Sequence, residues 1–506
     1  MREIIYPEDM RASEQRYFAS GAARSIDIME NAAAELAKAV RALACPGSLL
    51  RFACGTGGNG GDGTACARLL CGEYRCEIVL TGEAKTPDAV TNLARARALG
   101  LPVYTAEAAA GLPRPDVWID AMLGTGVTGK PRGTTAQLIG QIMKDKRKGA
   151  KVAAADIPSG LNGKTGIACE CHIEADATVT FGWLKPGLVL ADGLDACGKL
   201  TIADVGFPVS PFGPFIARLA DADFCREVLP RRPRNLHKNR CGHLLIVAGS
   251  RGMAGAAVMC ASAALRSGAG LVTVACPDSI LPILQARVPQ AMCVPLPEKN
   301  GALSAKCVPL LKQALEGKTA AVIGCGLSGN AAPEVTQTVL DAKLPTVVDA
   351  DGLNLLSRNP ALIGCLHEKC VLTPHPGEAL RFLRSLSPDM RVPEGQIAAA
   401  RVLRVYGAAV LLKGASTVIA DKEDSYISVS GCAGMARGGS GDILSGILGA
   451  LLADPNADTP ARAAACASEL HGLAGELAQQ KYGERAMNAM DILEFLPEVF
   501  KTCTPT

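Results

Sequence analysis

The sequence predicts an α/β protein with two domains, each a three-layer α/β/α arrangement in which helices cover both faces of a parallel sheet. Short, continuously apolar segments recur along the chain, and each is followed by a glycine-containing loop and a helical pattern. Such alternation is typical of parallel sheets whose strands are buried on both faces. The length of 506 residues exceeds what one hydrophobic core ordinarily supports, which favours two or more domains.

The expected strands fall into two groups. A helical pattern over residues 30–43 leads into the first group, which comprises residues 49–55, 76–82, 116–124, 151–160 and 175–183. Prolines and glycines then interrupt the pattern over residues 204–215, and a basic, proline-containing run follows over residues 229–243. Linkers have this composition, so we place the boundary near residue 215 and expect domains 1–215 and 216–506. The second group comprises residues 243–250, 271–277, 319–326, 345–352, 370–378 and 408–416.

Composition argues against nucleic acids and membranes as partners. The chain carries 52 lysines and arginines against 49 aspartates and glutamates, a formal net charge of +3, and 4% aromatic residues. That balance provides neither a basic surface nor a platform for stacked bases. The 20 cysteines include no CxxC pair, and the metal-like cluster at residues 169–172 lacks a second pair at zinc-finger spacing. We interpret the cysteines as small buried residues in a reducing compartment.

The sequence also predicts a cytoplasmic location. The first 15 residues are charged from the second residue onward and lack the apolar core of a signal peptide. The longest apolar run, residues 443–453, is too short to cross a bilayer.

Polar side chains gather where the expected strands of the first domain end. Asn59 and Asp62 follow the first strand, Asp120 lies at the end of the third, and Asp156 and Ser159 follow the fourth. The carboxyl ends of parallel strands meet at one edge of a sheet, where ligands bind. We therefore expect these five oxygen-bearing side chains to converge there as cation ligands or proton carriers.

Three other interpretations compete for this region. Asn59 and Asp62 could merely cap a helix beginning near Gly63, an alternative that stays open for Asp62 alone. Residues 124–131 have the GxxxxGK spacing of a phosphate loop, but Pro131 replaces the Ser or Thr that would hold Mg²⁺, which argues against an NTPase. The second expected strand ends without the acidic residue that would hold a ribose, which argues against an ordinary dehydrogenase.

Three motifs of the first domain resemble the N-terminal epimerase module of the bifunctional NAD(P)H-hydrate repair enzyme family. They are GNGGDG at residues 58–63, IDAMLGTG at residues 119–126 and DIPSG at residues 156–160. The resemblance implies a Rossmann-like domain that interconverts the R and S forms of hydrated NADH and NADPH (NADHX and NADPHX). The potassium ligands that it implies are Asn59, Asp120 and Ser159. The substrate-binding residues that it implies are Gly58, Asn59, Gly60, Gly61, Asp62, Gly124, Thr125, Gly126, Val127, Thr128, Gly129, Lys130 and Asp156.

Asp156 is the residue that we expect to transfer the proton, because a carboxylate is the best acid or base in this set. One position departs from the family pattern. Gly58 stands where the family has an asparagine, which removes a side-chain amide from the expected pocket.

The clearest motif of the second domain is the glycine run at residues 431–453, which passes directly into an apolar helix. Backbone N–H groups at such a helix start form an anion site, and the helix dipole strengthens it. Asp442 lies in the first turn, where it can approach a reacting hydroxyl. This Gly-Xaa-Gly-Asp turn resembles the ribokinase-like superfamily, whose anion hole and catalytic aspartate share it.

Five further segments resemble the ADP/ATP-dependent NAD(P)H-hydrate dehydratase within that superfamily: residues 247–257, 322–330, 348–354, 372–378 and 411–417. The resemblance implies that Asp442 is the base that activates the substrate hydroxyl for phosphoryl transfer, and nucleotide phosphates normally bring Mg²⁺. The residues implied for the adenosine nucleotide are Lys413, Gly414, Ala415, Ser416, Thr417 and Gly441. The residues implied for the hydrated dinucleotide are Ala256, Gly326, His375 and Asp442.

Several positions in the second domain carry a departure or an alternative. Cys432 and Ala433 stand where the family has Asn-Pro, and Arg437 stands where it has a small Thr or Ser. Arg437 lies in the anion loop and could strengthen phosphate binding or change the nucleotide preference. Without the neighbouring motifs, His375 would be interpreted as a rigid surface corner and Lys413 as a solvated lysine.

The two resemblances together imply a homo-oligomeric, bifunctional repair enzyme. It would interconvert the two epimers and dehydrate the S form to NAD(P)H at the expense of ADP or ATP, with ADP expected, releasing phosphate and AMP. Two alternatives belong to other classes: a small-molecule kinase with an accessory binding domain, and a first domain that senses or scaffolds nucleotides without catalysis. The presence of Asp156 and of all three potassium ligands counts against the last alternative.

Overall fold

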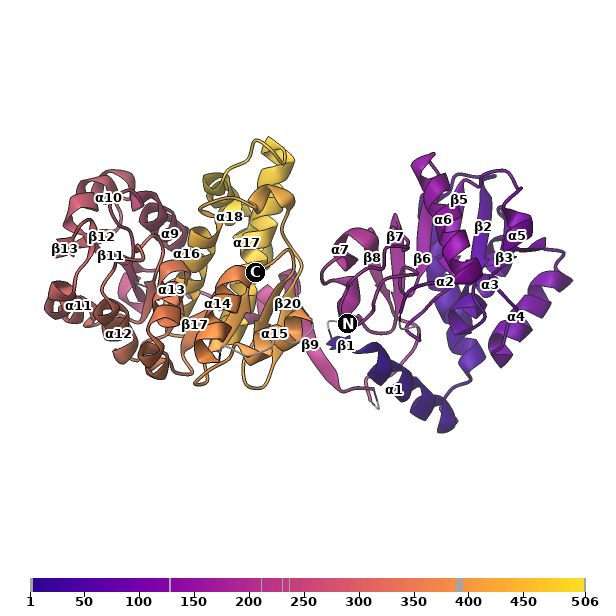
Figure 1. The fold of residues 1–506 in the computed structure, drawn as a ribbon, viewed down its shortest axis with the longest axis horizontal. Helices are drawn as coiled ribbons and strands as arrows, with labels where there is room; N and C mark the ends of the chain where they lie inside the picture. The colour runs from indigo at the N-terminus through magenta and orange to yellow at the C-terminus, as the bar shows by residue number, and fades with distance from the viewer. Residues whose placement is uncertain are drawn as a thin grey trace. The chain divides into compact units, whose positions relative to one another are not determined.

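The computed structural model of the chain consists of two units, Met1–Ile216 and Ala217–Thr506 (Figure 1). It describes residues 3–126, 129–210, 212–229, 231–235, 237–387 and 395–504. Two residues that we expect to bind substrate, Val127 and Thr128, lie outside the described residues.

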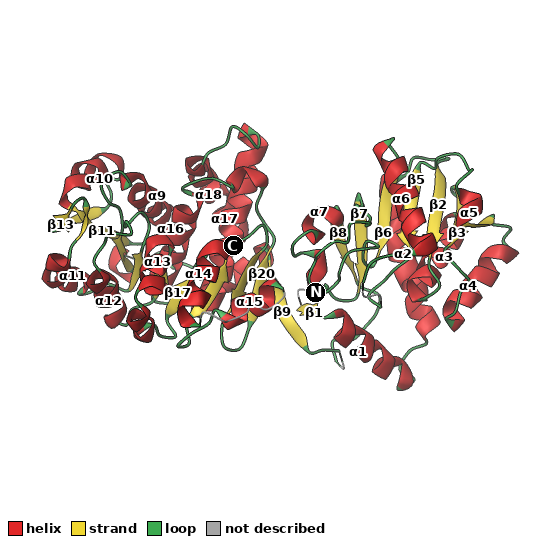
Figure 2. Cartoon of the chain, viewed as in Figure 1, coloured by secondary structure: helices red, strands yellow, loops and turns green. Residues whose placement is uncertain are grey.

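The first unit is built on a sheet with strand order β4-β3-β2-β5-β6-β7-β8, in which all neighbours run parallel. β2 pairs with both β3 and β5, so Phe52 lies opposite Ile78 on one side and Ile119 on the other. Side chains alternate between the two faces of a strand. Phe52 and Ile119 belong to a core shared with α2 and α3, whereas Trp118 and Val152 belong to a second core shared with α6. Helices therefore cover both faces (Figure 2).

The strands of the first unit are β1 (Glu3–Ile5), β2 (Leu49–Cys54), β3 (Arg75–Leu80), β4 (Val103–Thr105), β5 (Val117–Ala121), β6 (Lys151–Ala155), β7 (Ala177–Phe181) and β8 (Lys199–Ala203). Its helices are α1 (Pro7–Ala19), α2 (Ser25–Leu43), α3 (Gly58–Leu70), α4 (Pro87–Ala98), α5 (Ala106–Ala109), α6 (Gly133–Arg147), η1 (Pro186–Leu188) and α7 (Gly193–Ala196).

The second unit has a larger sheet, with strand order β9-β20-β19-β18-β17-β16-β15-β10-β11-β12. The strands from β18 to β12 run parallel, and β19 pairs antiparallel with both of its neighbours. A two-stranded antiparallel hairpin, β13–β14, lies outside this sheet. The prediction of an α/β protein with parallel sheets is confirmed for both halves.

The strands of the second unit are β9 (Phe215–Ala220), β10 (His243–Val247), β11 (Leu271–Pro277), β12 (Met292–Leu296), β13 (Glu298–Lys299), β14 (Ala302–Leu303), β15 (Ala320–Ile323), β16 (Thr346–Val348), β17 (Cys370–Leu372), β18 (Ala409–Leu412), β19 (Thr417–Ala420) and β20 (Ser425–Ser428). Its α-helices are α8 (Ala222–Val228), α9 (Ala254–Arg266), α10 (Leu281–Arg287), α11 (Val308–Leu315), α12 (Pro333–Asp341), α13 (Ala350–Arg358), α14 (Pro376–Leu386), α15 (Gln396–Val402), α16 (Ser440–Ala453), α17 (Pro460–Tyr482) and α18 (Ala489–Cys503). Its 3₁₀ helices are η2 (Lys238–Arg240), η3 (Asp278–Ile280), η4 (Ala305–Cys307), η5 (Pro360–Cys365) and η6 (Ala433–Met435).

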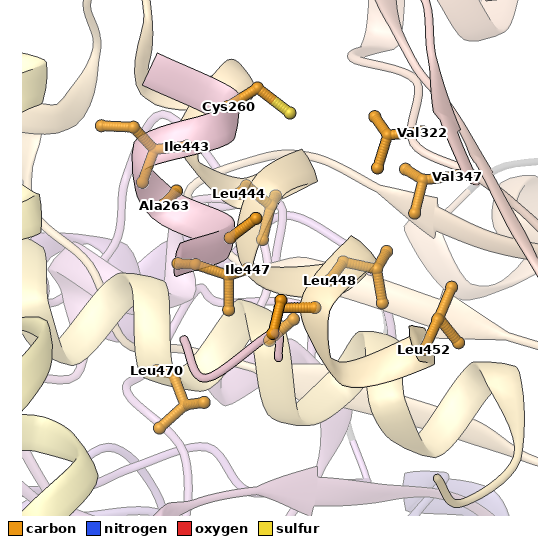
Figure 3. Packing of buried hydrophobic residues seen from close by; sticks show 14 of the residues in the cluster. Cys260, Ala263, Val322, Val347, Ile443, Leu444, Ile447, Leu448, Leu452 and Leu470 are labelled. Atoms are coloured by element: carbon orange, nitrogen blue, oxygen red, sulfur yellow. The ribbon is translucent and has the colours of Figure 1, made fainter. Parts of the chain in front are cut away.

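Helix α16 is the centre of the second core (Figure 3). Its side chains Ile443, Leu444, Ile447 and Leu448 are all buried, which is the pattern of a helix enclosed on every side. Gly446 permits this close packing, because a Cβ there would lie 2.2 Å from the carbonyl oxygen of Cys260 on α9. The helix that begins with Asp442 is thus held on all sides by the core.

The helix after the first glycine loop begins earlier than expected. α3 begins at Gly58 rather than near Gly63, and its N-cap residue, Gly57, makes no side-chain cap. Asn59 and Asp62 lie within the helix, so the capping alternative for these two residues was wrong. Glycine has the weakest helix propensity apart from proline, so a glycine-rich sequence gives little indication of where the helix starts.

Among the residues that the structure describes, the apolar segments and the cysteines form no membrane-spanning helix, metal cluster or disulfide. In the described ranges, no helix has both the length and the apolar character needed to cross a membrane. Within the same ranges, no group of three or more His, Cys, Asp or Glu side chains could hold a metal ion. The cluster at residues 169–172 forms a turn instead, in which His172 Nδ1 lies 2.7 Å from the Cys169 carbonyl oxygen. All 20 cysteines are free thiols.

Candidate active sites

Asp120 and Ser159 form the centre of the predicted cation site in the first unit. Asp120 is in β5 and Ser159 follows the turn after β6, and both side chains are buried. The Ser159 hydroxyl donates to Asp120 Oδ1 and the Ser159 backbone N–H donates to Asp120 Oδ2, both at 2.7 Å. Burial raises the pKa of Asp120 to about 6, although these hydrogen bonds oppose the rise.

Leu123 connects Asn59 to the same two residues. The Leu123 N–H donates to Ser159 Oγ at 3.0 Å, and its carbonyl accepts from Asn59 Nδ2 at 2.9 Å. Asn59 Oδ1 is buried and has no hydrogen-bond partner among the described residues. A buried oxygen without a donor is costly unless an ion or water satisfies it, and hard cations take oxygen ligands. Asn59, Asp120 and Ser159 therefore fit a potassium ion.

Asp156 is fixed at the same edge of the sheet by a buried lysine. Its Oδ1 accepts from Lys185 Nζ at 2.7 Å and from Thr180 Oγ1 at 3.0 Å. Lys185 is 1% exposed and also donates to the Thr180 hydroxyl at 3.0 Å and to the Phe181 carbonyl at 2.8 Å. Asp156 has a left-handed backbone, with φ of 62°. Such a conformation costs on the order of 1–3 kcal/mol in a residue other than glycine and is concentrated at functional sites.

The motifs did not identify Lys185 as a functional residue. The one feature of the sequence that indicates it is its position as the single charged residue in the apolar run at residues 181–190, all of which are buried. Lysine is almost never fully buried unless it is paired, so an isolated lysine in such a run indicates a buried acidic partner.

Asp62 lies near the same carboxylate. Burial raises the pKa of Asp62 well above its ordinary range, and the negative charges of Asp156, Glu14 and Asp88 raise it further. The site therefore contains several acidic groups that interact with one another, which is typical of acid/base sites.

The glycines of the first loop differ in the space around them. A Cβ on Gly60 would lie 2.0 Å from the Gly55 carbonyl oxygen, so this position requires glycine, whereas one on Gly61 would lie 2.7 Å from Met29 Cε at the end of a flexible side chain. A Cβ on Gly58 would meet nothing within 4 Å, so the family's asparagine would have room there. The other described residues of the expected substrate set are partly or fully exposed: Gly124, Thr125, Gly126, Gly129 and Lys130.

In the second unit, the partly exposed Lys413 and the buried Asp349 form an ion pair beside the start of α16. Lys413 Nζ donates to Asp349 Oδ1 at 2.7 Å, and the Ser445 hydroxyl donates to Asp349 Oδ2 at 2.7 Å. Burial alone would raise the pKa of Asp349, but Lys413 and Ser445 outweigh it and hold the pKa below its ordinary value. A Cβ on Gly441 would lie 3.5 Å from Lys413 Nζ. Lys413 and Gly441, both expected at the nucleotide, are therefore adjacent.

Asp442 lies in the first turn of α16, directly after Gly441. The N-cap residue is Gly439, which has a left-handed φ of 97°, and a Cβ there would lie 2.5 Å from Met259 Sδ, so only glycine fits. Burial and the negative charge of Asp349 raise the pKa of Asp442 to about 6. The carboxylate is thus a weak base that is ionised at neutral pH, which suits proton abstraction from a hydroxyl.

Side chains of α17 hold the loop that precedes α16. Glu469 accepts from the hydroxyls of Ser428 (3.0 Å) and Ser430 (2.7 Å). Glu476 accepts from the Gly431 N–H at 2.8 Å, and the side-chain oxygen of Gln479 accepts from the Gly434 N–H at 3.0 Å. The anion loop is therefore fixed by a buried helix, and sequence reasoning gave α17 no role.

The Arg437 side chain hydrogen-bonds outside the loop that is predicted to bind phosphate. It is exposed, and its guanidinium donates to the backbone carbonyls of Glu484 and Arg485. Both carbonyls belong to the segment between α17 and α18. Arg437, which replaces the family's small residue, therefore links the loop before α16 to that segment.

Two of the residues expected at the hydrated dinucleotide lie side by side. A Cβ on Gly326 would lie 2.7 Å from Ala256 Cβ, so larger side chains at either position would close this space. His375 is the N-cap of α14: its Nδ1 accepts from the N–H groups of Gly377 (3.0 Å) and Glu378 (3.4 Å). Because Nδ1 accepts, the neutral ring carries its proton on Nε2.

The segment at residues 413–417 forms the turn between β18 and β19 and the first residue of β19. Ser416 is buried, and a Cβ on Gly414 would lie 3.0 Å from its carbonyl oxygen and 3.5 Å from Gln396 Nε2. Gln396 Oε1 is buried and has no hydrogen-bond partner in the described part of the chain. This unsatisfied acceptor lies beside the predicted nucleotide segment, and no motif pointed to it.

Comparisons with known proteins match both units. A family model described as NAD(P)H-hydrate dehydratase matches residues 244–498, and one described as YjeF-related protein N-terminus matches residues 25–187. The bifunctional NAD(P)H-hydrate repair enzyme Nnr of Moorella thermoacetica is 38% identical over 497 residues, covering 94% of this chain and 92% of that protein. The chain belongs to the family of bifunctional NAD(P)H-hydrate repair enzymes. The Escherichia coli member is 36% identical over 454 residues, covering 88% of this chain and 84% of that protein.

Membership in the repair enzyme family confirms the resemblance that the motifs indicated, including an enzyme of two modules in this order. Solved structures matched by the chain include the ADP/ATP-dependent NAD(P)H-hydrate dehydratase from Bacillus subtilis co-crystallized with ATP/Mg²⁺, 26% identical, covering 56% of this chain and 98% of that chain, with a TM-score of 0.44. A ribokinase-like superfamily protein from Enterococcus faecalis is 27% identical, covering 56% of this chain and 95% of that chain, with a TM-score of 0.48.

Proposed function

We propose that this protein repairs hydrated nicotinamide cofactors, interconverting the epimers of NADHX and NADPHX in the first unit and dehydrating the S form in the second. Family membership over most of the chain supports the proposal. The observation that carries it is that motif residues far apart in the sequence meet in each unit. Leu123 links Asn59 to Ser159, which donates to Asp120, and Lys413 adjoins Gly441.

In the first unit, the two glycine loops would hold the dinucleotide and Asp156 would transfer the proton. Asn59, Asp120 and Ser159 would hold a potassium ion, which supplies positive charge beside the substrate's phosphates or ring when bound. Lys185 keeps Asp156 in one orientation through a 2.7 Å ion pair, so that its second oxygen can face the substrate.

In the second unit, residues 413–417 and Gly441 would hold ADP or ATP, and Mg²⁺ on the nucleotide would neutralise phosphate charge. Asp442 would take the proton of the substrate hydroxyl as that oxygen attacks the terminal phosphorus, which displaces AMP when ADP is the donor. The phosphate would then leave with the electrons of the C–O bond, and loss of a proton from the neighbouring carbon would restore the ring double bond. Lys413, which is paired with the buried Asp349, places a positive charge beside the first turn of α16.

The test is to incubate mixed R and S NADHX with the protein and ADP and to follow NADH absorbance and free phosphate. The wild type should convert the whole mixture, Asp156→Ala should convert the S fraction quickly and the R fraction slowly, and Asp442→Ala should convert neither. Asp195→Ala and Asp278→Ala, at exposed positions of the two units, are the matched controls and should behave as wild type. A phosphorylated product without NADH formation would identify a kinase instead and would end the proposal.

Potassium, Mg²⁺, a homo-oligomeric assembly and a cytoplasmic location belong to the proposal as well. Potassium dependence is tested by replacing KCl with tetramethylammonium chloride, and the assembly by sedimentation.

A further inference from the structure

Helix α1 packs on the turn that carries Asp156. Pro7 contacts this turn: a Cβ on Gly163 would lie 3.0 Å from Pro7 Cγ and 2.7 Å from Ile157 Cδ1. Met10 lies beside the strand end that precedes Lys185, because its Cε is 3.1 Å from the position of a Cβ on Gly182. One face of α1 therefore covers the site.

Arg11 and Glu14 lie on that same face, because helix positions 7, 10, 11 and 14 point in one direction. Arg11 Nη2 donates to the Thr125 carbonyl at 2.8 Å, which places the helix against the loop expected to hold substrate. The charges that act on Glu14 are those of Lys185, Asp156 and Arg11, and Glu14 in turn acts on Asp62. α1 precedes the residues matched by the family model, 25–187, and carries none of the motifs.

Asp156 offers one oxygen to the substrate. Oδ1 accepts from Lys185, from Thr180 and from the Phe181 N–H at 3.4 Å. Within the described part of the chain no donor is recorded at Oδ2. Because three donors, one of them the Lys185 cation, occupy Oδ1, Oδ2 is the oxygen that can accept a proton from the substrate.

We propose that Glu14 and Asp156 are the acid and base of the epimerase reaction, with Lys185 as the positioning residue for Asp156. The proposal rests on the epimerase function proposed above, and it assigns to α1 the group that gives a proton to the leaving hydroxyl.

The chemistry needs one acid and one base. The dihydronicotinamide ring is an enamine, so hydration places the hydroxyl on a carbon bonded to the ring nitrogen. Glu14 gives its proton to that hydroxyl, the C–O bond breaks with its electron pair on oxygen, and water leaves while the nitrogen lone pair forms a C=N bond. Water then adds to the opposite face and gives a proton to Asp156, which regenerates the hydrate with inverted configuration. No electron is gained or lost, and the pair holds one proton before and after.

The surroundings of Glu14 suit the acid role. Burial, with a smaller contribution from the negative charge of Asp156, raises the pKa of Glu14 to about 7, although Lys185 and Arg11 oppose the rise. Glu14 is therefore partly protonated at neutral pH and largely protonated below it, while Asp156 is paired with Lys185. The equilibrium between two epimers involves no net proton, so the rate in both directions should fall together as pH rises through about 7.

The experiment compares Glu14→Gln with Glu8→Gln in the full-length protein. Glu8 lies on the same helix, is exposed and pairs with Lys164 at 2.6 Å, so it is a matched control. The approach of R-NADHX to the equilibrium mixture is measured without ADP, by chromatography, from pH 5.5 to 9. Glu14→Gln should lower kcat about 100-fold, as expected for loss of a general acid, with KM within about threefold, and should abolish the fall in rate above pH 7. Glu8→Gln should leave both unchanged.

Two further measurements separate the possible failures. Exchange of ¹⁸O from labelled water into the hydrate should accompany each wild-type inversion and slow in Glu14→Gln. Lys185→Met should lower kcat and Lys185→Arg should restore part of it. Thermal unfolding and the dehydratase rate on S-NADHX check that each variant is folded, and Glu14→Asp provides a second variant if Glu14→Gln is unstable. A folded Glu14→Gln with wild-type kcat and an unchanged pH profile overturns the acid role, whereas a wild type that cannot interconvert the epimers overturns the proposed function itself.

Discussion

Gly441 and Gly446 lie on the same helix, α16, but an added methyl group would meet opposite surroundings. On Gly446 a Cβ would lie 2.2 Å from the Cys260 carbonyl oxygen and 2.8 Å from Ala263 Cβ, whereas on Gly441 the nearest atom is Lys413 Nζ at 3.5 Å. Gly446→Ala must therefore push α16 and α9 apart by about 1 Å, because packed interiors leave no free space. Gly441→Ala fits as it stands.

These contacts set the size of the effect. Overpacking costs about 1–3 kcal/mol, and the gain in helix propensity from Gly to Ala is about 1 kcal/mol. Because Gly446 meets backbone rather than a flexible side chain, we expect an overpacking cost near the upper end of that range, about 3 kcal/mol. The propensity gain of about 1 kcal/mol reduces it to a net destabilisation of about 2 kcal/mol. Gly441→Ala keeps part of the propensity gain at the first turn and should stabilise the unit by about 0.5 kcal/mol. For a domain of this size the Tm should fall by about 5 °C in the first variant and rise by about 1 °C in the second.

The assay is calorimetry of the full chain, in which the transition that ADP shifts upward identifies the second unit. The dehydratase rate is measured in parallel. Gly441→Ala should raise the KM for ADP more than tenfold although it is slightly more stable than wild type, because the methyl group occupies the space where phosphate would approach the backbone. If Gly446→Ala is as stable as wild type, or Gly441→Ala is the less stable of the two, the packing argument is refuted.

Three further predictions follow from the two sites. Lys413→Met leaves Asp349 buried without its cation and should destabilise the second unit by about 3 kcal/mol in calorimetry, and an unchanged Tm would contradict the ion pair. The pKa of about 6 at Asp442 predicts that the dehydratase kcat/KM falls as pH drops below 6, where the base becomes protonated; a profile that is flat from pH 5 to 8 would exclude Asp442 as the base. Asn59→Leu removes the unsatisfied oxygen at the proposed potassium site and should make the epimerase rate independent of KCl while the Tm changes little, and a retained potassium dependence would place the ion elsewhere.

The sequence predicted the parts of the fold that local patterns encode. Strand ends located Asp120, Asp156 and Ser159 at one edge, because parallel strands share an edge whatever their order. The order itself, in which β2 lies between β3 and β5, depends on pairings between distant segments that no local pattern reveals. The short strands β4 and β12 were missed for the same reason, since their partners, rather than their own residues, make them strands.

The partners of the catalytic candidates could not be predicted either. Asp349 lies within a segment that the resemblance singled out, but its pairing with Lys413 joins the residues that directly follow β16 and β18 and depends on how those strands are arranged in the sheet. Glu14 belongs to a polar helix whose charged residues resemble any solvated surface, and only the packing of α1 on the Asp156 turn distinguishes it from Glu8. Burial of a charge is a property of the assembled fold, and its sequence signal appears only where, as at Lys185, the neighbours are all apolar.

The loop before α16 is tied at successive points to α17, a helix whose own residues form the interior. The affinity for the nucleotide should consequently depend on how well α17 is packed. Any agent that loosens α17 without unfolding the chain, such as mild denaturant or oxidation of Met435, which packs on Gly475, should weaken ADP binding before the bulk circular dichroism changes.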